Sequence, residues 1–111
     1  QVIEPQLYEL QGAHVAAGLV QSPNGYCAPI SAQPMPAESL VAVYGQFLSR
    51  NRVTMIILYT ADQEQVLNVA VYPYLFKTEY VFFRLPADIH GEVWIHAIGN
   101  ANSNAVRIFV Q

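Results

Sequence analysis

Three histidines, eight carboxylates and one cysteine are the side chains of this sequence that could support catalysis or bind a metal. The histidines are His14, His90 and His96. Extended chain between His90 and His96 spans about 20 Å. A zinc ion binds histidine nitrogens at about 2 Å, so these two residues are too far apart to share one metal ion. We therefore predict no metal site. The sequence also has no glycine loop that could cradle a phosphate and no C-x-x-C motif, so no cofactor is predicted.

Two pairs of carboxylates lie in predicted turns, namely Asp62 with Glu64 and Asp88 with Glu92. Glycoside hydrolysis uses two carboxyl groups about 5 to 10 Å apart across a cleft. Acids in the turns of a β-sandwich are commonly solvated instead, and no G-x-S-x-G surrounds a serine. We interpret Cys27, the single cysteine, as a small buried hydrophobic residue that forms no internal disulfide. No catalytic residue is predicted, and we expect a protein that is not an enzyme.

Aromatic side chains are more informative than the titratable ones. Trp, Tyr and Arg concentrate binding energy at protein interfaces, and aromatic planes also stack on sugar rings. The predicted interface or ligand-binding residues are Trp94, His96, Arg107, Phe109, Tyr72, Tyr80 and Phe82. A protein partner or a second copy of the chain is the favoured occupant. Carbohydrate, or a cover formed by another part of the same chain, is the alternative.

The stretch from residue 91 to residue 110 must position four of these side chains. Two runs with period-two alternation flank a segment rich in Gly, Asn and Ser, a pattern typical of a β-hairpin. If Ile98 lies opposite Ala105, Trp94 meets Phe109 and His96 meets Arg107 on the outer face. The opposite face, which we predict to be core, contains Val93, Ile95, Ala97, Val106, Ile108 and Val110.

Further strands are predicted at short spacing along the chain, and no segment has the periodicity of a helix. They cover residues 13–20, 40–48, 53–59, 66–72 and 79–85, with Gly45 marking a bulge or bend. The strand at 53–59 is apolar on both faces, so it must be covered on both or exposed at an interface. Residues 21–36 hold four of the seven prolines and are predicted as an irregular surface segment. The pattern predicts an all-β sandwich of about seven strands.

Composition narrows the classes of partner. At 111 residues the chain is predicted to be one domain. Charged residues make up 12% and hydrophobic residues 53%, so part of the apolar surface should contact another chain or domain. The net charge is −3 and no basic patch is present, so nucleic acid is not predicted as a partner. The apolar runs are shorter than the roughly 18 residues of a spanning helix, and no membrane-spanning segment is predicted.

From residue 28 onward the layout resembles the immunoglobulin-like IPT/TIG domain family. Three pieces carry the likeness: Ile30, Ser31 and Pro34; Val41, Val43, Gly45 and Phe47 or Leu48; and Leu85, Pro86, Gly91, Val93, Ile95, Gly99 and Ser103. Gly45 and Phe47 are one residue closer than the family pattern has them, and residues 1–27 have no counterpart in it. The resemblance implies an immunoglobulin-like sandwich over residues 28–111, preceded by an N-terminal extension or extra strand over residues 1–27.

These observations lead to one functional expectation. We expect a non-catalytic structural or protein-interaction module of a larger extracellular, cell-surface or virion-type assembly, which binds through an aromatic sheet face. The alternative is a carbohydrate-binding module attached to a polysaccharide-acting enzyme.

Overall fold

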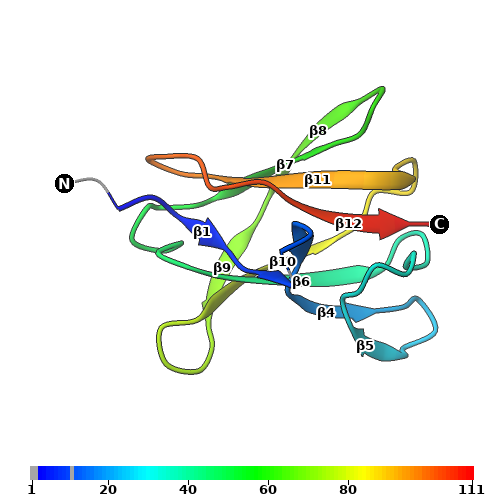
Figure 1. Ribbon diagram of the computed structural model, residues 1–111, viewed down its shortest axis with the longest axis horizontal. Helices are drawn as coiled ribbons and strands as arrows, with labels where there is room; N and C mark the ends of the chain where they lie inside the picture. Colours follow the sequence, from blue (N-terminus) through cyan, green and yellow to red (C-terminus); the bar gives the residue numbers. More distant parts are fainter. Residues whose placement is uncertain (1–2, 11) are drawn as a thin grey trace.

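Alternating apolar residues build two antiparallel-rich sheets that stack face to face as a β-sandwich in the computed structural model, which describes residues 3–10 and 12–111 (Figure 1). The first sheet, sheet A, has the order β5-β4-β6-β10-β9, and β1 also pairs with β6. Its strands are β1 (Gln6–Leu7), β4 (Gly18–Gln21), β5 (Cys27–Pro29), β6 (Leu40–Gln46), β9 (Ala70–Pro73) and β10 (Glu79–Arg84).

The second sheet, sheet B, has the order β2-β3-β12-β11-β7-β8. Its strands are β2 (Glu9–Leu10), β3 (Val15–Ala16), β7 (Met55–Tyr59), β8 (Glu64–Asn68), β11 (Gly91–Ile98) and β12 (Val106–Val110). The described residues contain no helix, so no helix long and apolar enough to cross a membrane is present among them. Among the described residues, twelve strand segments replace the expected seven or so, because the predicted strands 13–20 and 66–72 each divide into two and the short strands β1, β2 and β5 are additional. Strand β5 lies within residues 21–36, which were predicted to be irregular.

The core lies between the two sheets and is made of their inward-facing aliphatic residues. The six residues predicted as the core face of the closing hairpin are all buried, with Val110 the most exposed at 4%. They meet inward side chains of sheet A and of β7, namely Val41, Val43, Val81, Phe83, Ile56 and Leu58. Period-two alternation identified these faces because successive side chains of a strand point to opposite sides of the sheet.

The predicted register of the closing hairpin is wrong by two residues. Trp94 lies opposite Arg107 and Glu92 lies opposite Phe109, so the predicted pairs of Trp94 with Phe109 and His96 with Arg107 do not form. The loop is tighter than predicted, with a bridge between Ile98 and Asn102. An even shift leaves each side chain on its predicted face, which explains how the faces are right and the pairs wrong.

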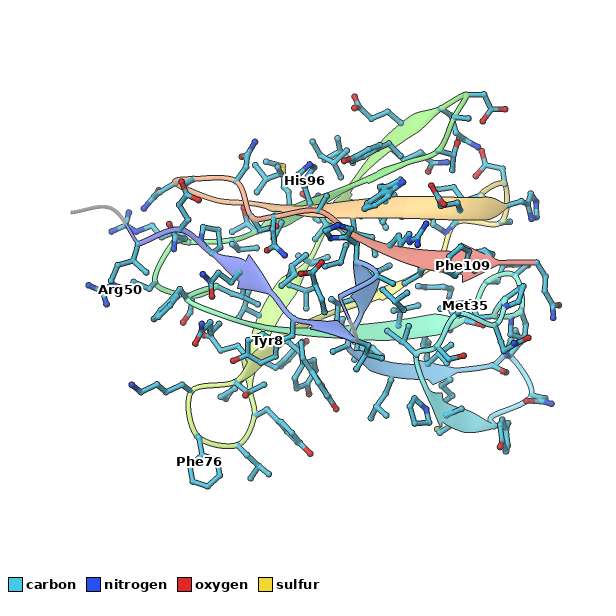
Figure 2. All side chains as sticks on the ribbon, viewed as in Figure 1. Tyr8, Met35, Arg50, Phe76, His96 and Phe109 are labelled. Carbon is cyan, nitrogen blue, oxygen red and sulfur yellow. The ribbon has the colours of Figure 1, made fainter. Side chains whose placement is uncertain are left out.

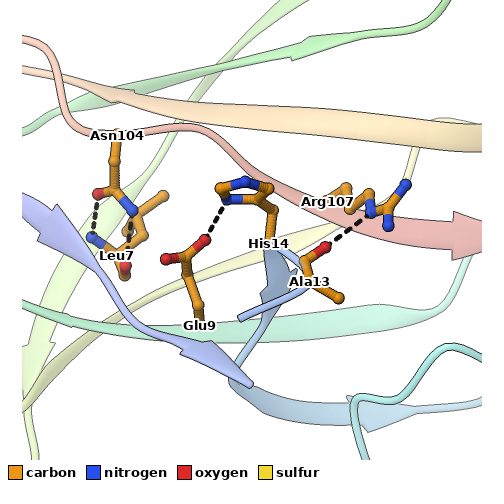
Figure 3. Close-up of polar contacts among 6 residues, drawn as sticks. All are labelled: Leu7, Glu9, Ala13, His14, Asn104 and Arg107. Atoms are coloured by element: carbon orange, nitrogen blue, oxygen red, sulfur yellow. Dashed lines mark hydrogen bonds and ion pairs between the residues drawn. The ribbon is translucent and has the colours of Figure 1, made fainter. Parts of the chain in front are cut away.

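Residues 6–21, within the segment predicted as an extension or extra strand, contribute β1 to β4 and contact both sheets. Strand β3 runs parallel to β12, and β4 runs antiparallel to β6. The side chain of Asn104 fixes β1, since its Oδ1 accepts from the Leu7 backbone N–H at 2.8 Å and its Nδ2 donates to the Leu7 carbonyl at 2.9 Å (Figure 3). Leu7, Val15, Ala16 and Val20 are buried in the core.

Gly45 does not form the predicted bulge. It pairs in regular register with Glu79 on one side and Leu7 on the other. A Cβ at this position would lie 2.2 Å from the backbone oxygen of Gln6, a distance that no side chain can occupy. Glycine is therefore required here because the backbone of β1 approaches β6 closely.

Candidate functional site

The seven predicted binding residues divide between opposite faces of the sandwich. Trp94 and His96 on β11, with Arg107 and Phe109 on β12, lie on the outer side of sheet B, and we call these four residues the Trp94 face. Tyr72 on β9 and Tyr80 and Phe82 on β10 lie on the outer side of sheet A. Tyr44 and Tyr74 join this second group, and we call Tyr44, Tyr72, Tyr74, Tyr80 and Phe82 the tyrosine face.

The four tyrosines of the tyrosine face form one cluster. Strand pairing places Tyr80 opposite both Tyr44 and Tyr72. The rings of Tyr72 and Tyr80 stack at a centroid distance of 5.4 Å, and those of Tyr44 and Tyr74 stack at 5.3 Å. Tyr80 meets Tyr44 edge-on at 6.2 Å, so the two stacked pairs are joined. Such geometries are the favoured ones for aromatic pairs and fix the rings as a rigid surface.

A groove of about 280 Å³ lies beside this cluster, over β4, β6 and β10. Cys27 of β5 lies at the groove and is exposed, so our prediction that this cysteine is buried is wrong. Large apolar side chains around the groove are exposed to solvent, with Leu19 at 46% and Phe82 at 42%. The residues that line it are Leu19, Val20, Gln21, Cys27, Leu40, Ala42, Tyr44, Tyr74, Tyr80 and Phe82, and none of them is charged.

Partial burial affects one titratable group of the groove, the phenol of Tyr44. Burial, followed by the neighbouring hydroxyls of Tyr74 and Tyr80, raises the pKa of Tyr44 above its ordinary value of 10.0. Desolvation disfavours the phenolate form, so Tyr44 presents a neutral hydroxyl at physiological pH. The surface therefore offers apolar contact and a few hydroxyl groups rather than charge.

The Trp94 face is organised differently, around the guanidinium of Arg107. This group lies 5.6 Å from the ring centroid of Trp94 and 5.3 Å from that of Phe109, within the range of cation–π contacts. Its Nη1 donates to Oε2 of Glu92 at 2.9 Å, and its Nε donates to the carbonyl of Ala13 at 3.0 Å, the contact drawn in Figure 3. Because Trp94 Nε1 also donates to Glu92 at 2.7 Å, both carboxylate oxygens are occupied.

His96 belongs to the same face but not to the Arg107 network. Its ring stacks on Tyr59 of β7 at a centroid distance of 5.6 Å, and its Nδ1 lies 2.8 Å from the carbonyl of Ser103. Tyr59 is half-buried, as are its outward neighbours Met55 and Ile57, whereas Ile56 and Leu58 on the inner side are fully buried. Strand β7, which was predicted at residues 53–59 as apolar on both faces, is thus covered by the core on one side and shielded by cross-strand neighbours on the other.

A hollow of about 580 Å³ lies at the end of the Trp94 face. Aromatic rings of Tyr59 and Trp94 form part of its wall, and Asp62, His90 and Glu92 supply polar groups. This combination of aromatic planes and hydrogen-bonding groups is the kind of surface that a sugar ring can use. Tyr72 and Tyr80, which are also among the predicted binding residues, lie on the opposite side of the sandwich from Trp94.

Several of the titratable residues considered for chemistry have structural partners. His14 pairs with the carboxylate of Glu9 (Figure 3), and His90 Nδ1 lies 2.6 Å from the carbonyl of Gln111. Within residues 3–10 and 12–111, no three His, Cys, Asp or Glu side chains come close enough together to hold a metal ion. Asp62 accepts from the Thr60 hydroxyl at 2.8 Å, as an acid in a turn commonly does.

Sequence reasoning missed Tyr44 and Tyr74. The alternation of Leu40, Ala42 and Tyr44 in the predicted strand 40–48 was a usable signal, since it places Tyr44 on an outer face. What the sequence did not provide is the pairing of this strand with β10, and that pairing brings Tyr44 next to Tyr80.

The comparisons with known proteins give no relative: the sequence matches no protein-family model, and no curated protein matches it significantly.

Proposed function

We propose that this chain is a non-catalytic interaction module that binds a protein partner through the tyrosine face. The groove beside Tyr44, Tyr74 and Tyr80 carries the proposal, because it is concave, uncharged and bordered by exposed large apolar side chains. Protein interfaces are enriched in aromatic residues and depleted of charge at their centre. Contiguous exposed apolar surface of this kind commonly marks a binding site.

A protein partner suits this groove better than a sugar. Gln21 is the one lining residue with a side-chain amide, and the remaining polar side-chain groups are the tyrosine hydroxyls and the thiol of Cys27. Sugar hydroxyls that enter such a groove would lose hydration without enough hydrogen-bond partners, which is unfavourable. The tyrosine rings also stack on one another, so part of their planar surface is already in use.

The arrangement of strands supports an immunoglobulin-like classification as part of the same proposal. Immunoglobulin-like domains place strands A, B, E and D in one sheet and G, F and C in the other, with an additional C′ in some. The runs β4-β6-β10-β9 and β12-β11-β7-β8 have this order. An IPT/TIG-type module at a cell surface, in a secreted protein or in a virion is the setting we infer, since sandwiches of this architecture are common in cell-surface domains.

Cys27 provides a direct test, because it is the single cysteine and is exposed at the groove. A benzophenone maleimide attached to Cys27 should cross-link the chain to a protein in an extract of its source. The adduct should disappear with excess unlabelled protein and with a Phe82→Ser variant. The matched control carries the label on Val66→Cys in a Cys27→Ser chain, since Val66 is 55% exposed on sheet B. Equal adducts from both labels, or none from Cys27, would contradict the proposal.

Carbohydrate binding is the second candidate, and the hollow at Tyr59, Trp94 and Glu92 is the observation that favours it. Trp94 is the only tryptophan, so its fluorescence reports on this hollow alone. A titration with a panel of glycans should change the emission of the wild-type protein, and a Tyr59→Ala variant should weaken the response. Unchanged emission with every glycan would exclude this candidate for the panel tested.

A further inference from the structure

The loop between β9 and β10 carries an apolar knob next to the groove. We use the term knob for Leu75 and Phe76, which are 60% and 102% exposed. Figure 2 shows Phe76 at the tip of this loop, pointing away from the two sheets. Its φ of 55° lies in the left-handed region, which bulky residues rarely adopt. The chain therefore presents a fully solvated phenyl ring on a convex tip, in a backbone conformation that glycine or asparagine would adopt more easily.

The knob and the groove belong to the same outer surface of sheet A. Tyr74 contributes to the groove wall and directly precedes the knob in sequence. In Figure 1 the β9–β10 loop and the β4–β5 hairpin extend from sheet A on the side away from sheet B. At about 280 Å³ the groove is below the roughly 300 to 1,000 Å³ of pockets that hold drug-sized ligands, so it suits one or two large side chains.

We propose that the occupant of the groove is a second copy of this chain, whose Leu75 and Phe76 enter it. This proposal rests on the proposed function and names its partner. Because knob and groove lie on one surface, a twofold axis can place each knob in the partner's groove at once. Contacts of this kind are isologous, so they close into a dimer instead of continuing into a filament.

The apolar area available agrees with a dimer of ordinary size. Six large apolar residues of this surface are between 42% and 102% exposed, namely Leu19, Tyr72, Tyr74, Leu75, Phe76 and Phe82. At about 200 Å² for a fully exposed large side chain, they leave roughly 700 Å² accessible. Standard protein interfaces bury about 800 Å² on each partner, so these side chains supply most of what a stable dimer needs.

Charge also favours a second copy over an oppositely charged partner. The groove lining has no charged side chain, and Lys77 is the one charged residue in the β9–β10 loop. Two identical surfaces can meet only where like charges do not oppose each other, and an uncharged groove meets this condition.

Sedimentation velocity over a wide concentration range tests the dimer. We expect the dimer fraction of the purified chain to rise with concentration, and Phe76→Ser to weaken the dimer by roughly tenfold or more, as for a central aromatic at an interface. Leu19→Ser, at the groove, should act similarly. Val66→Ser, at an apolar position on sheet B that is 55% exposed, is the control and should leave the dimer unchanged.

A disulfide cross-link tests the geometry. One chain keeps Cys27, and a second chain carries Cys27→Ser with Lys77→Cys, next to the knob. Oxidation of the mixture should give a disulfide between the two chains, and Phe76→Ser in the second chain should abolish it. As a control, a second chain with Cys27→Ser and Val66→Cys should form no more disulfide with the first chain than the same two chains form by random collision when unfolded.

Several outcomes would overturn the proposal. They are a monomer at every concentration, a dimer that Phe76→Ser does not weaken, or a cross-link that forms equally from Val66→Cys. A monomer that sediments with phosphatidylcholine–phosphatidylserine vesicles in a manner dependent on Phe76 would assign the knob to a lipid surface instead. If the chain is monomeric while the Cys27 label still captures another protein specifically, this inference fails and the proposed function stands. If that capture also fails, both fall.

Discussion

The two outer faces of this sandwich hold their aromatic residues in different ways. On the Trp94 face, the guanidinium of Arg107 packs over the rings of Trp94 and Phe109 and pairs with Glu92, and all four side chains are half-buried. On the tyrosine face, the rings contact one another beside an uncharged groove, and three of the five side chains are more than 40% exposed. One face is completed by its own chain, and the other leaves apolar surface in contact with water.

The difference shows why aromatic content alone does not locate a binding surface. The ring of Trp94 already packs on Arg107 and donates to Glu92, so a partner gains little by covering it. A ring beside an exposed apolar groove still has contacts to make, and burying it releases water. The distinction depends on which residues lie opposite one another in the sheet, and variants on each face can test it.

The largest effect on stability is expected from Trp94→Ala. The change removes the ring that packs on Arg107 and the donor to Glu92, and we expect a loss of about 2 to 3 kcal/mol, less than the roughly 3 to 5 kcal/mol for a fully buried aromatic. Phe82→Ala, on the tyrosine face, should cost less than about 1 kcal/mol because the ring is 42% exposed. Urea denaturation measures both, and equal losses would remove the distinction between the faces.

A smaller loss of stability is expected from Asn104→Ala, in the loop between β11 and β12. Two hydrogen bonds between Asn104 and Leu7 hold β1, and their loss at a solvent-accessible site should cost about 1 to 2 kcal/mol. Hydrogen exchange should accelerate at the amide of Leu7 while the amides of β9 and β10 keep their rates. Asn102→Ala, at a nearby exposed loop position, is the control. If hydrogen exchange accelerates uniformly through both sheets, the two hydrogen bonds between Asn104 and Leu7 stabilise the whole fold.

The sequence was sufficient to predict the faces of the strands but not their partners. Val93, Ile95 and Ile108 alternate with polar and aromatic neighbours, and burial follows that alternation directly. The register of the same hairpin depends on the bridge from Ile98 to Asn102 and on the hydrogen bonds of Ser103 with Ala97. Loop contacts of this kind have no periodic signal, so the predicted pairs were displaced by two residues.

The candidate site could be predicted only in part for a related reason. Tyr72 was chosen as an aromatic beside Pro73, Tyr80 because it shares a strand face with Phe82, and Trp94 as an expected neighbour of Phe109. That Tyr80 lies opposite Tyr44, and on the far side of the sandwich from Trp94, depends on pairing between strands distant in sequence. Gly45 illustrates the same limit, because the backbone of Gln6 that requires a glycine there comes from nearly forty positions away.

We expect Glu92→Gln to lower the free energy of unfolding by about 0.5 to 1 kcal/mol, since ion pairs between partly exposed side chains contribute little to stability. The loss should be largest at low ionic strength and should shrink in 1 M salt, where the Debye length is about 3 Å. Urea denaturation at both salt concentrations measures it. Glu64→Gln is the control, because Glu64 forms no ion pair among the described residues. If the loss of stability does not change with salt, it arises from the hydrogen bond with Trp94 rather than from the charge of Arg107.

The smallest effect concerns Tyr44 at alkaline pH. Burial, and then the nearby Tyr74 and Tyr80, raise the pKa of Tyr44 in the folded protein above the ordinary value of 10.0, so the unfolded chain loses this proton first. The contribution of Tyr44 to stability is therefore fully present below about pH 10 and declines as the pH rises toward its folded pKa. A Tyr44→Phe variant should lose less stability over that interval than the wild type, as measured by denaturation at successive pH values. Tyr26→Phe, at a position that is 69% exposed on the β4–β5 hairpin, is the control and should follow the wild type. If Tyr44→Phe also follows the wild type, Tyr44 is as well solvated as a tyrosine on open surface. The two faces would then not differ in how strongly they disfavour a charged side chain.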